Sequence, residues 1–116
     1  MKVLVCGGRE FKDASRIREV LSAFHAAQPI ARLIEGGATG ADKLAFEWAK
    51  GHNVAVSKYR AKWHLHGKAA GPIRNELMLR AGQPDVVIAF PGGAGTAHMV
   101  KIAREAGVEV LVIKET

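Results

Sequence analysis

The sequence predicts a single three-layer α/β domain, in which a parallel sheet lies between two layers of helices. The first observation behind this prediction is that short apolar runs alternate with apolar stripes at helical spacing along the whole chain. The second is that glycine-rich turns directly follow three of the runs. The third is the length, because 116 residues suffice for one hydrophobic core but not for two independent domains.

Five apolar runs are the predicted strands of the sheet. The first is rich in valine and ends at a glycine pair, which is typical of a strand buried on both faces. In chain order the predicted strands span residues 2–6, 30–35, 54–57, 85–90 and 108–113.

Four segments between these runs are the predicted helices. In chain order they span about 13–27, 41–51, 70–79 and 99–106. Pro29 follows the end of the first helix, and Gly51 and Gly107 end the second and the last. The stripe of the second helix places Trp48 in the core. Residues 59–71 show no clean period.

The positive charge is concentrated in one segment of the chain. The net charge is +6, and residues 58–74 carry +5 of it without a single carboxylate. This segment is either a solvated basic loop or the contact for an anionic partner, which would be nucleic acid or a small phosphate compound.

The single cysteine, Cys6, excludes an internal disulfide and a zinc site with several cysteines, so we expect a cytoplasmic protein. Its place at the end of an apolar strand indicates a small core residue. The apolar run at the N-terminus is too short for a signal peptide, and no membrane span is expected. His64 and His66 lack a nearby third ligand, so neither a metal nor a cofactor is expected.

The glycine-rich turns predict a ligand site. In a parallel sheet the turns 7–8, 36–37 and 92–95 gather at the same carboxyl edge, which is where open α/β sheets bind ligands. Glycine lets backbone approach a ligand closely, and a following helix offers free N–H groups to a phosphate. The alternative is that these glycines only make tight turns. Neither the dinucleotide fingerprint nor a Walker loop is present.

Two further features have a structural and a functional interpretation. Thr39 and Asp42 have the spacing of a capping box at the start of the second helix, and either residue also fits ligand contact. Trp63 stands among basic residues and glycines, where it is either a surface residue or a platform for a base.

Four blocks of sequence stand in order along almost the whole chain: 5–11 (VCGGREF), 36–42 (GGATGAD), Trp63 with 67–75 (GKAAGPIRN), and 89–96 (AFPGGAGT). Together they resemble the SLOG superfamily of Rossmann-like proteins, and most closely its YspA/YpsA-related branch. The resemblance implies a five-stranded sheet of order 3-2-1-4-5, with the ligand cleft between the first and fourth strands.

The superfamily includes the LOG phosphoribohydrolases, which cleave an N-glycosidic bond of nucleotides, and DprA, which binds single-stranded DNA. The LOG motif carries glutamates two and three places after its threonine, and this chain has His98 and Met99 there. Arg74 matches the LOG arginine. Because a carboxylate stabilises the charge that develops during such cleavage, its loss favours binding without LOG-type hydrolysis.

The sequence thus leaves two functional hypotheses. In the first, the protein binds a nucleotide or another phosphorylated small molecule, with Trp63 or Phe11 on the base and nucleic acid as a weaker alternative partner. In the second, the same residues serve an N-glycosidic hydrolase in which Arg74 acts with Asp42 or Glu10 as the substitute carboxylate. The predicted ligand-binding residues are Gly7, Gly8, Arg9, Phe11, Gly36, Gly37, Thr39, Asp42, Trp63, Lys68, Arg74, Asn75, Pro91, Gly92, Gly93, Gly95 and Thr96.

The last strand also predicts assembly. Residues 108–113 are apolar on both faces, and no helix follows them in this sequence to cover the bare face. Because monomers seldom expose a large apolar strip, we expect a homo-oligomer, most simply a two-fold dimer.

Overall fold

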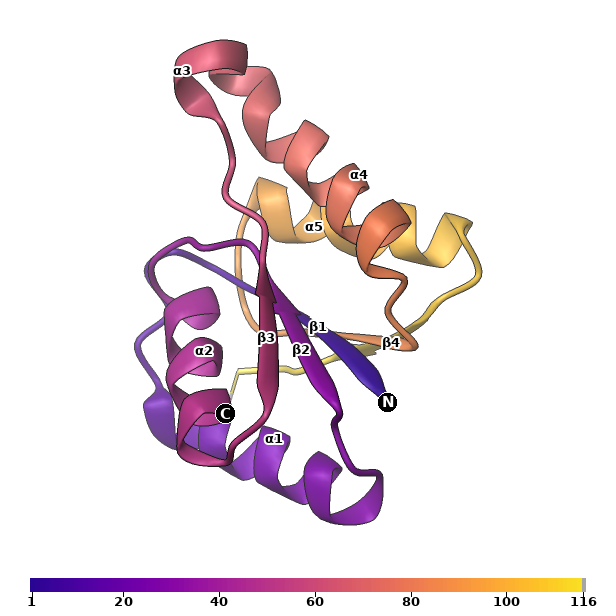
Figure 1. Cartoon of the computed structure of the whole chain (residues 1–116). Coiled ribbons are helices and arrows are strands. Elements are labelled where there is room, and N and C mark those ends of the chain that lie inside the picture. Colours follow the sequence, from indigo (N-terminus) through magenta and orange to yellow (C-terminus); the bar gives the residue numbers. More distant parts are fainter. Residues whose placement is uncertain (116) are drawn as a thin grey trace.

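The protein forms a five-stranded sheet in which every neighbouring pair of strands is parallel (Figure 1). The structure, a computed structural model, describes residues 1–115. The strands are β1 (Lys2–Cys6), β2 (Arg32–Glu35), β3 (Ala55–Lys58), β4 (Val86–Ala89) and β5 (Glu109–Val112). Their order is β3-β2-β1-β4-β5, which confirms the predicted 3-2-1-4-5 sheet and the α/β Rossmann-like fold.

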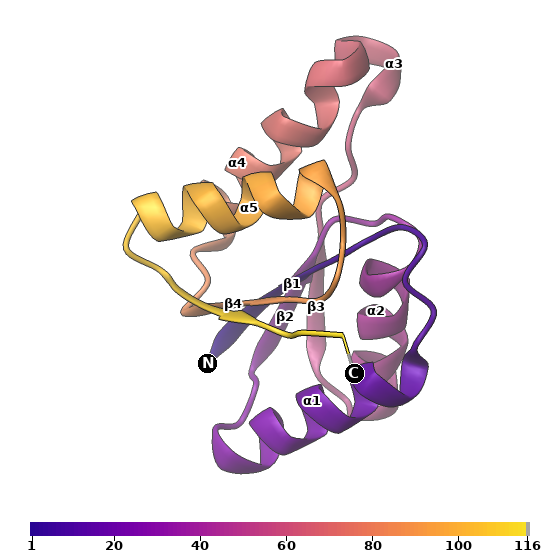
Figure 2. The ribbon, with the colours of Figure 1, turned by 180° about the vertical axis from the view of Figure 1, so that it is seen from behind.

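Two pairs of helices cover the two faces of the sheet, as Figures 1 and 2 show from opposite sides. The helices α1 (Ala14–Ala27) and α2 (Ala41–Gly51) pack together on one face. The helices α4 (Ala70–Gly82) and α5 (Ala94–Glu105) pack together on the other. Within residues 1–115, none of the helices has the length and apolar character that a membrane crossing requires.

Two segments differ from the sequence-based expectation. The stretch without a period contains a short helix, α3 (Trp63–His66), and a 3-10 turn, η1 (Gly67–Ala69). Neither buries a residue, which is why no apolar period marked them. The helix α5 begins at Ala94, earlier than its apolar stripe indicated, because packing against β4 and α4 outweighs the low helix propensity of Gly95 and Thr96.

The core has one part on each face of the sheet. Val3 and Val5 point toward α1 and α2, whereas Leu4 and Cys6 point toward α4 and α5, as the alternation of side chains along a strand requires. Trp48 is 6% exposed and donates its indole N–H to Ser22, so the prediction of a core tryptophan is confirmed. These two layers fix the carboxyl edge of the sheet, where the glycine-rich turns meet.

The last strand is better covered than the sequence indicated. Leu111 and Ile113 pack on the part of the core that includes α1 and α2, and Val110 packs on the part that includes α4 and α5. Phe11 and Phe90 belong to the same cluster as Leu111. The expected apolar strip is therefore only partly covered, and Val112 on this strand stays 51% exposed.

Candidate ligand site

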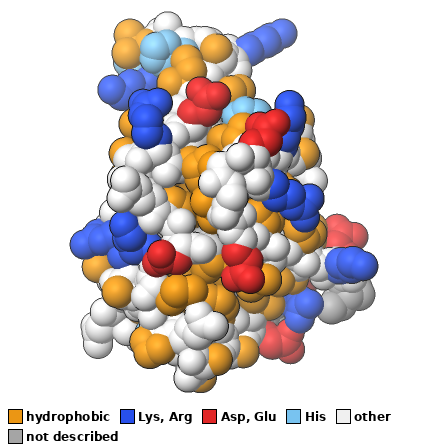
Figure 3. Space-filling model, turned by 90° about the vertical axis from the view of Figure 1, so that its right-hand side faces the viewer, with side chains coloured by type: hydrophobic (Ala, Val, Ile, Leu, Met, Phe, Trp, Pro, Cys, Tyr) orange, Lys and Arg blue, Asp and Glu red, His pale blue; other side chains and the backbone are white. Residues whose placement is uncertain are grey.

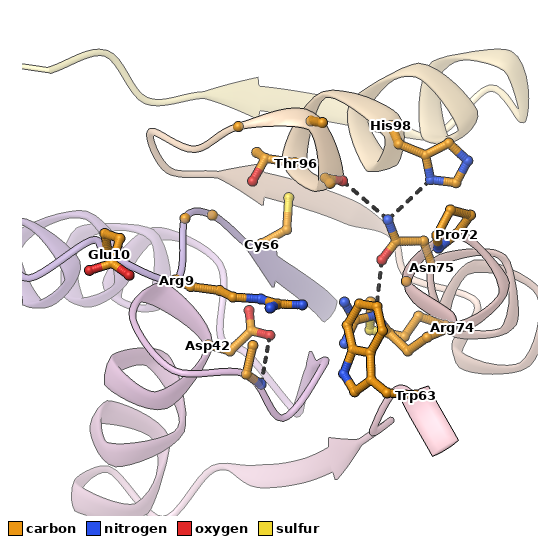
Figure 4. A pocket seen from close by; sticks show the side chains of 18 of the residues that line it. Cys6, Arg9, Glu10, Asp42, Trp63, Pro72, Arg74, Asn75, Thr96 and His98 are labelled. Atoms are coloured by element: carbon orange, nitrogen blue, oxygen red, sulfur yellow. Dashed lines mark hydrogen bonds between the residues drawn. The ribbon is translucent and has the colours of Figure 1, made fainter. Parts of the chain in front are cut away.

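A cavity of about 630 Å³ opens at the carboxyl edge of the sheet, between the β1–α1 turn, the start of α2, the α3–α4 segment and the start of α5 (Figure 4). Its volume is in the range of small-molecule sites. Of the residues singled out from the sequence, those that line it are Gly7, Gly8, Arg9, Glu10, Asp42, Trp63, Lys68, Arg74, Asn75, Gly93, Gly95 and Thr96. Residues from four separate sequence blocks thus meet around one space.

Six residues predicted to bind the ligand lie outside the lining of this cavity. They are Phe11, Gly36, Gly37, Thr39, Pro91 and Gly92. Most of them support the turns around it. The Pro91 carbonyl accepts a hydrogen bond from Gly8 N–H at 2.9 Å, and the Thr39 hydroxyl donates to the Arg9 carbonyl at 3.3 Å. Phe11 packs on Phe90 with ring centroids 5.6 Å apart.

Arg74 is held in place by two hydrogen bonds. Its Nη1 donates to the Gly36 carbonyl at 2.7 Å, and its Nε donates to Asn75 Oδ1 at 3.0 Å. Burial lowers the pKa of Arg74; Asp42 opposes this shift and Arg9 adds to it. Arg9 and Arg74 both line the cavity, and their side chains extend into it from different elements (Figure 4). Within residues 1–115 neither of them, nor Lys68, forms an ion pair with a carboxylate.

Asp42 is almost fully buried beside the glycine turn that follows β2. Its Oδ2 accepts hydrogen bonds from the N–H groups of Gly36 and Ala38, both at 3.2 Å. Burial raises the pKa of Asp42 to about 6, and nearby Glu35 adds to the shift. Among the described residues, the other carboxylate oxygen, Oδ1, has no hydrogen-bond partner in the protein. Asp42 is thus a carboxyl group that titrates near neutral pH in the wall of the cavity.

The predicted capping box at the start of α2 is wrong. The N-cap residue is Gly40, which has no side chain to cap with, and Thr39 lies one residue before it. Gly40 has a φ of +74°, and a Cβ there would collide with the Gly8 carbonyl. This close approach of two backbone segments fixes the position of α2, and it leaves Asp42 to bind the turn rather than its own helix.

An aromatic ring forms part of the cavity mouth. Trp63 is 46% exposed, and the guanidinium carbon of Arg9 lies 4.8 Å from the centre of its ring. In Figure 4 the Arg9 side chain extends from the β1–α1 turn across the cavity toward Trp63. This cation–π contact joins the two sides of the opening.

The opposite wall is the first turn of α5. Gly93 is its N-cap residue, and the N–H groups that follow have no acceptor within the helix. Asn75, which is 4% exposed, connects this turn to α4, because its amide nitrogen donates to the Gly95 carbonyl at 3.1 Å. The same nitrogen lies 3.1 Å from His98 Nδ1, so His98 accepts from it (Figure 4).

Some lining residues were not predicted as ligand contacts. They are Cys6, Ala38, Gly71, Pro72, Met78, Ala94 and His98. Cys6 was expected in the core, where it is indeed found at 8% exposure, and it also reaches the cavity floor. Burial raises the pKa of its thiol to about 12, so the thiol is protonated at neutral pH. His98 was noted only as the residue at the position of a LOG glutamate; its contact with Asn75 spans 23 residues and leaves no local signal.

The cavity has no arrangement of ligands for a metal ion. Among residues 1–115, no three histidine, cysteine or carboxylate side chains lie close enough to hold one. The groups that line the cavity include cations, backbone N–H groups, the ring of Trp63 and the carboxyl group of Asp42.

Three comparisons relate this chain to other proteins. The family described as the YspA, cpYpsA-related SLOG family matches residues 1–66. The Gene 61 protein of Mycobacterium phage D29 is 40% identical over an alignment of 118 positions, which covers 95% of this chain and 94% of that protein. DNA processing protein A (DprA) from Streptococcus pneumoniae superposes with a TM-score of 0.79 at 19% identity, over 99% of this chain and 50% of that chain. The likeness to DprA shows the shared fold, and this chain spans half of that protein's length.

Proposed function

The chain belongs to the YspA, cpYpsA-related SLOG family, and we propose that it binds a nucleotide or another phosphorylated small molecule in this cavity. One observation supports this most directly. Arg9 and Arg74 both line the cavity, and among the described residues neither forms a direct ion pair with a carboxylate. Two cationic side chains that line one cavity without a direct ion pair suit an anion.

Each wall of the cavity would have its own part in binding. The free N–H groups at the start of α5 would hold a phosphate, which the positive end of the helix also favours. Arg74 would pair with that phosphate, and Lys68 lies in the same lining. Trp63 would stack on the base, since its ring already accepts a planar cation, Arg9, over its face.

Asp42 supports a second candidate, an N-glycosidic hydrolase. A carboxyl group whose pKa is raised to about 6 can hold or release a proton at neutral pH. Glu10 also lines the cavity but is exposed, so Asp42 is the better substitute for the LOG glutamate. We favour binding over hydrolysis because two backbone N–H groups already occupy one oxygen of this carboxylate.

Calorimetric titration with the four common nucleoside monophosphates and with inorganic phosphate tests the proposal. We expect at least one mononucleotide to bind and Arg74→Ala to weaken that binding at least tenfold, because a charge-assisted hydrogen bond contributes about 1.5–3 kcal/mol. Arg18→Ala, on the exposed side of α1, is the matched control and should bind like the wild type. Equal affinity of the Arg74→Ala variant would move the site elsewhere.

Chromatography of the same mixtures separates the two candidates. Free base that accumulates with the wild type and disappears with Asp42→Asn would establish the hydrolase. An unchanged nucleotide with a measurable heat of binding is the expected result.

The proposal also includes the cellular compartment and the assembly state of the protein. The protein would work in the cytoplasm, since its one cysteine is buried and free. It would work as a homo-oligomer, since large hydrophobic side chains stay exposed on its surface.

A further inference from the structure

Exposed large hydrophobic side chains gather on the α3–α4 segment. Among the described residues, six such side chains are exposed, and four of them lie between residues 63 and 77: Trp63, Leu65, Ile73 and Leu77. In Figure 3, hydrophobic and histidine side chains gather at the top of the molecule, at the height of α3 in Figure 1. The other two, Met1 and Val112, stand at distant places in the sequence.

The helix α4 carries both buried and exposed apolar side chains. Ala70 and Met78 are buried against the rest of the domain. Ile73 is 43% exposed and Leu77 is 39% exposed. These two residues are four apart, so with Ala81 they form one continuous ridge along the outer face. A helix that only covers a sheet has no need for this second apolar ridge.

Two opposite charges flank that ridge. Glu76 and Arg80 are exposed and one helical turn apart, and within residues 1–115 they form no ion pair with each other or with another side chain. An acid and a base in this arrangement complement an identical helix that runs in the opposite direction. The rotation of a two-fold axis would place each acid opposite the base of the second copy.

We propose that the outer face of α4 is the contact surface of an antiparallel, two-fold homodimer of this chain. With the axis near Leu77, this side chain meets the same residue of the second copy. Ile73 is then level with the partner's Ala81, and the partner's Arg80 lies two residues, or about 3 Å along the helix, from the level of Glu76, which these long side chains can span. Leu65 lies on the neighbouring α3 and extends the apolar surface.

This dimer has a consequence for the cavity on the other side of the same helix. Arg74 and Asn75 belong to α4 and line the cavity, and Trp63 belongs to α3, which packs on α4. Contact with a second copy would therefore hold the helix that carries these side chains. The proposal itself does not depend on which ligand the cavity takes.

Sedimentation equilibrium of the wild type and of Leu77→Lys, with circular dichroism to establish that each is folded, tests the dimer. We expect a wild-type mass of two chains at micromolar concentration and at least a tenfold higher dimer dissociation constant for Leu77→Lys. Val112→Lys, at the exposed edge of the sheet, is the matched control and should stay dimeric. A wild-type monomer at 100 µM, or a folded Leu77→Lys variant with wild-type dissociation, would overturn the proposal.

Charge reversal tests the orientation of the two helices. Glu76→Arg and Arg80→Glu, each alone, should weaken the dimer several-fold, because each places two like-charged pairs across the axis. The double variant should recover to within about twofold of the wild type, because both pairs are restored with exchanged signs. Two weakened single variants without recovery would overturn the antiparallel arrangement. Binding of mononucleotides by calorimetry is a separate measurement, so failure of the dimer and failure of the ligand site are distinguishable.

Discussion

Arg74 reaches the carbonyl oxygen of Gly36, 38 residues away in sequence, with its Nη1 at 2.7 Å. The contact joins α4 to the turn after β2 and determines where the guanidinium lies in the cavity. It requires glycine at position 36, because a Cβ there would lie 2.8 Å from Arg74 Cζ and 3.0 Å from Asp42 Oδ2. Gly36 therefore lets the Arg74 guanidinium lie against this turn, in addition to its role in the backbone of the turn.

The Gly36→Ala variant should lose ligand affinity with only a moderate loss of stability. The added methyl group displaces the flexible end of Arg74, so we expect the unfolding free energy to fall by about 1 kcal/mol for the lost hydrogen bond. Ligand affinity should fall at least several-fold, as measured by calorimetry. Gly51→Ala is the control, since no atom lies within 4 Å of its added Cβ. Wild-type affinity in Gly36→Ala would mean that the ligand does not need Arg74 at this position.

Gly95 should separate binding from folding. A Cβ at this position would meet no atom within 4 Å, and Gly95 lines the cavity in the first turn of α5. Alanine favours a helix by up to about 1 kcal/mol over glycine, so the melting temperature of Gly95→Ala should stay equal or rise. Ligand affinity should fall, because the methyl group takes space beside the N–H groups of the turn.

Gly40→Ala should lose stability, in contrast to Gly95→Ala. Its φ of +74° and the collision with Gly8 are predicted to lower the melting temperature clearly. If Gly95→Ala binds as tightly as the wild type, then the ligand does not approach the first turn of α5.

The strands and the family could be predicted from local sequence, because valine-rich runs that end in glycine carry their own signal. Contacts that depend on distant residues could not. The spacing of Thr39 and Asp42 fits a capping box, but the close approach of Gly40 to the β1–α1 turn decides that Asp42 instead binds the backbone of Gly36. No local pattern contains that information.

Dependence on distant residues also explains why some residues of the cavity could not be predicted. The short helix α3 buries nothing, so it had no period, yet it carries the tryptophan that meets Arg9. The roles of Asn75 and His98 appear only when α4 and α5 lie side by side. The glycine-rich blocks predicted correctly that the turns meet at the carboxyl edge of the sheet. The side chains that complete the cavity wall are brought there by the packing of helices that are distant in sequence.

The titration of Asp42 should make stability depend on pH in a defined window. Its pKa is raised from 3.8 to about 6, so the folded protein binds more protons than the unfolded chain between these values. The unfolding free energy contributed by Asp42 is therefore fully present below about pH 4 and is lost as the pH rises to about 6. Asp42→Asn is neutral throughout, and its oxygen can still accept from Gly36 and Ala38.

Urea unfolding at pH 4, 5, 6 and 7 measures this contribution. The stability of Asp42→Asn relative to the wild type should rise across that window and then stay constant. Glu35, whose pKa is also raised by burial, is present in both proteins, so the difference between them reports Asp42 together with its interaction with Glu35. A difference that does not change with pH would mean that Asp42 keeps an ordinary pKa.

Binding of single-stranded DNA should be weak and should depend steeply on salt. The cations that line the cavity are Arg9, Lys68 and Arg74, and they can contact about three phosphates of one strand. For single strands the logarithm of the binding constant falls by about 0.7 per contacted phosphate for each tenfold rise in salt. Affinity should therefore fall roughly twentyfold between 50 and 200 mM salt, which fluorescence anisotropy of a labelled oligonucleotide measures.

Two variants test which cations contact the DNA. Lys68→Ala should reduce the slope of the logarithm of the binding constant against the logarithm of salt concentration by about 0.7, whereas Lys43→Ala, on the exposed side of α2, should leave it unchanged. Tight oligonucleotide binding that persists at physiological salt, without competition by mononucleotides, would favour nucleic acid as the ligand of this cavity.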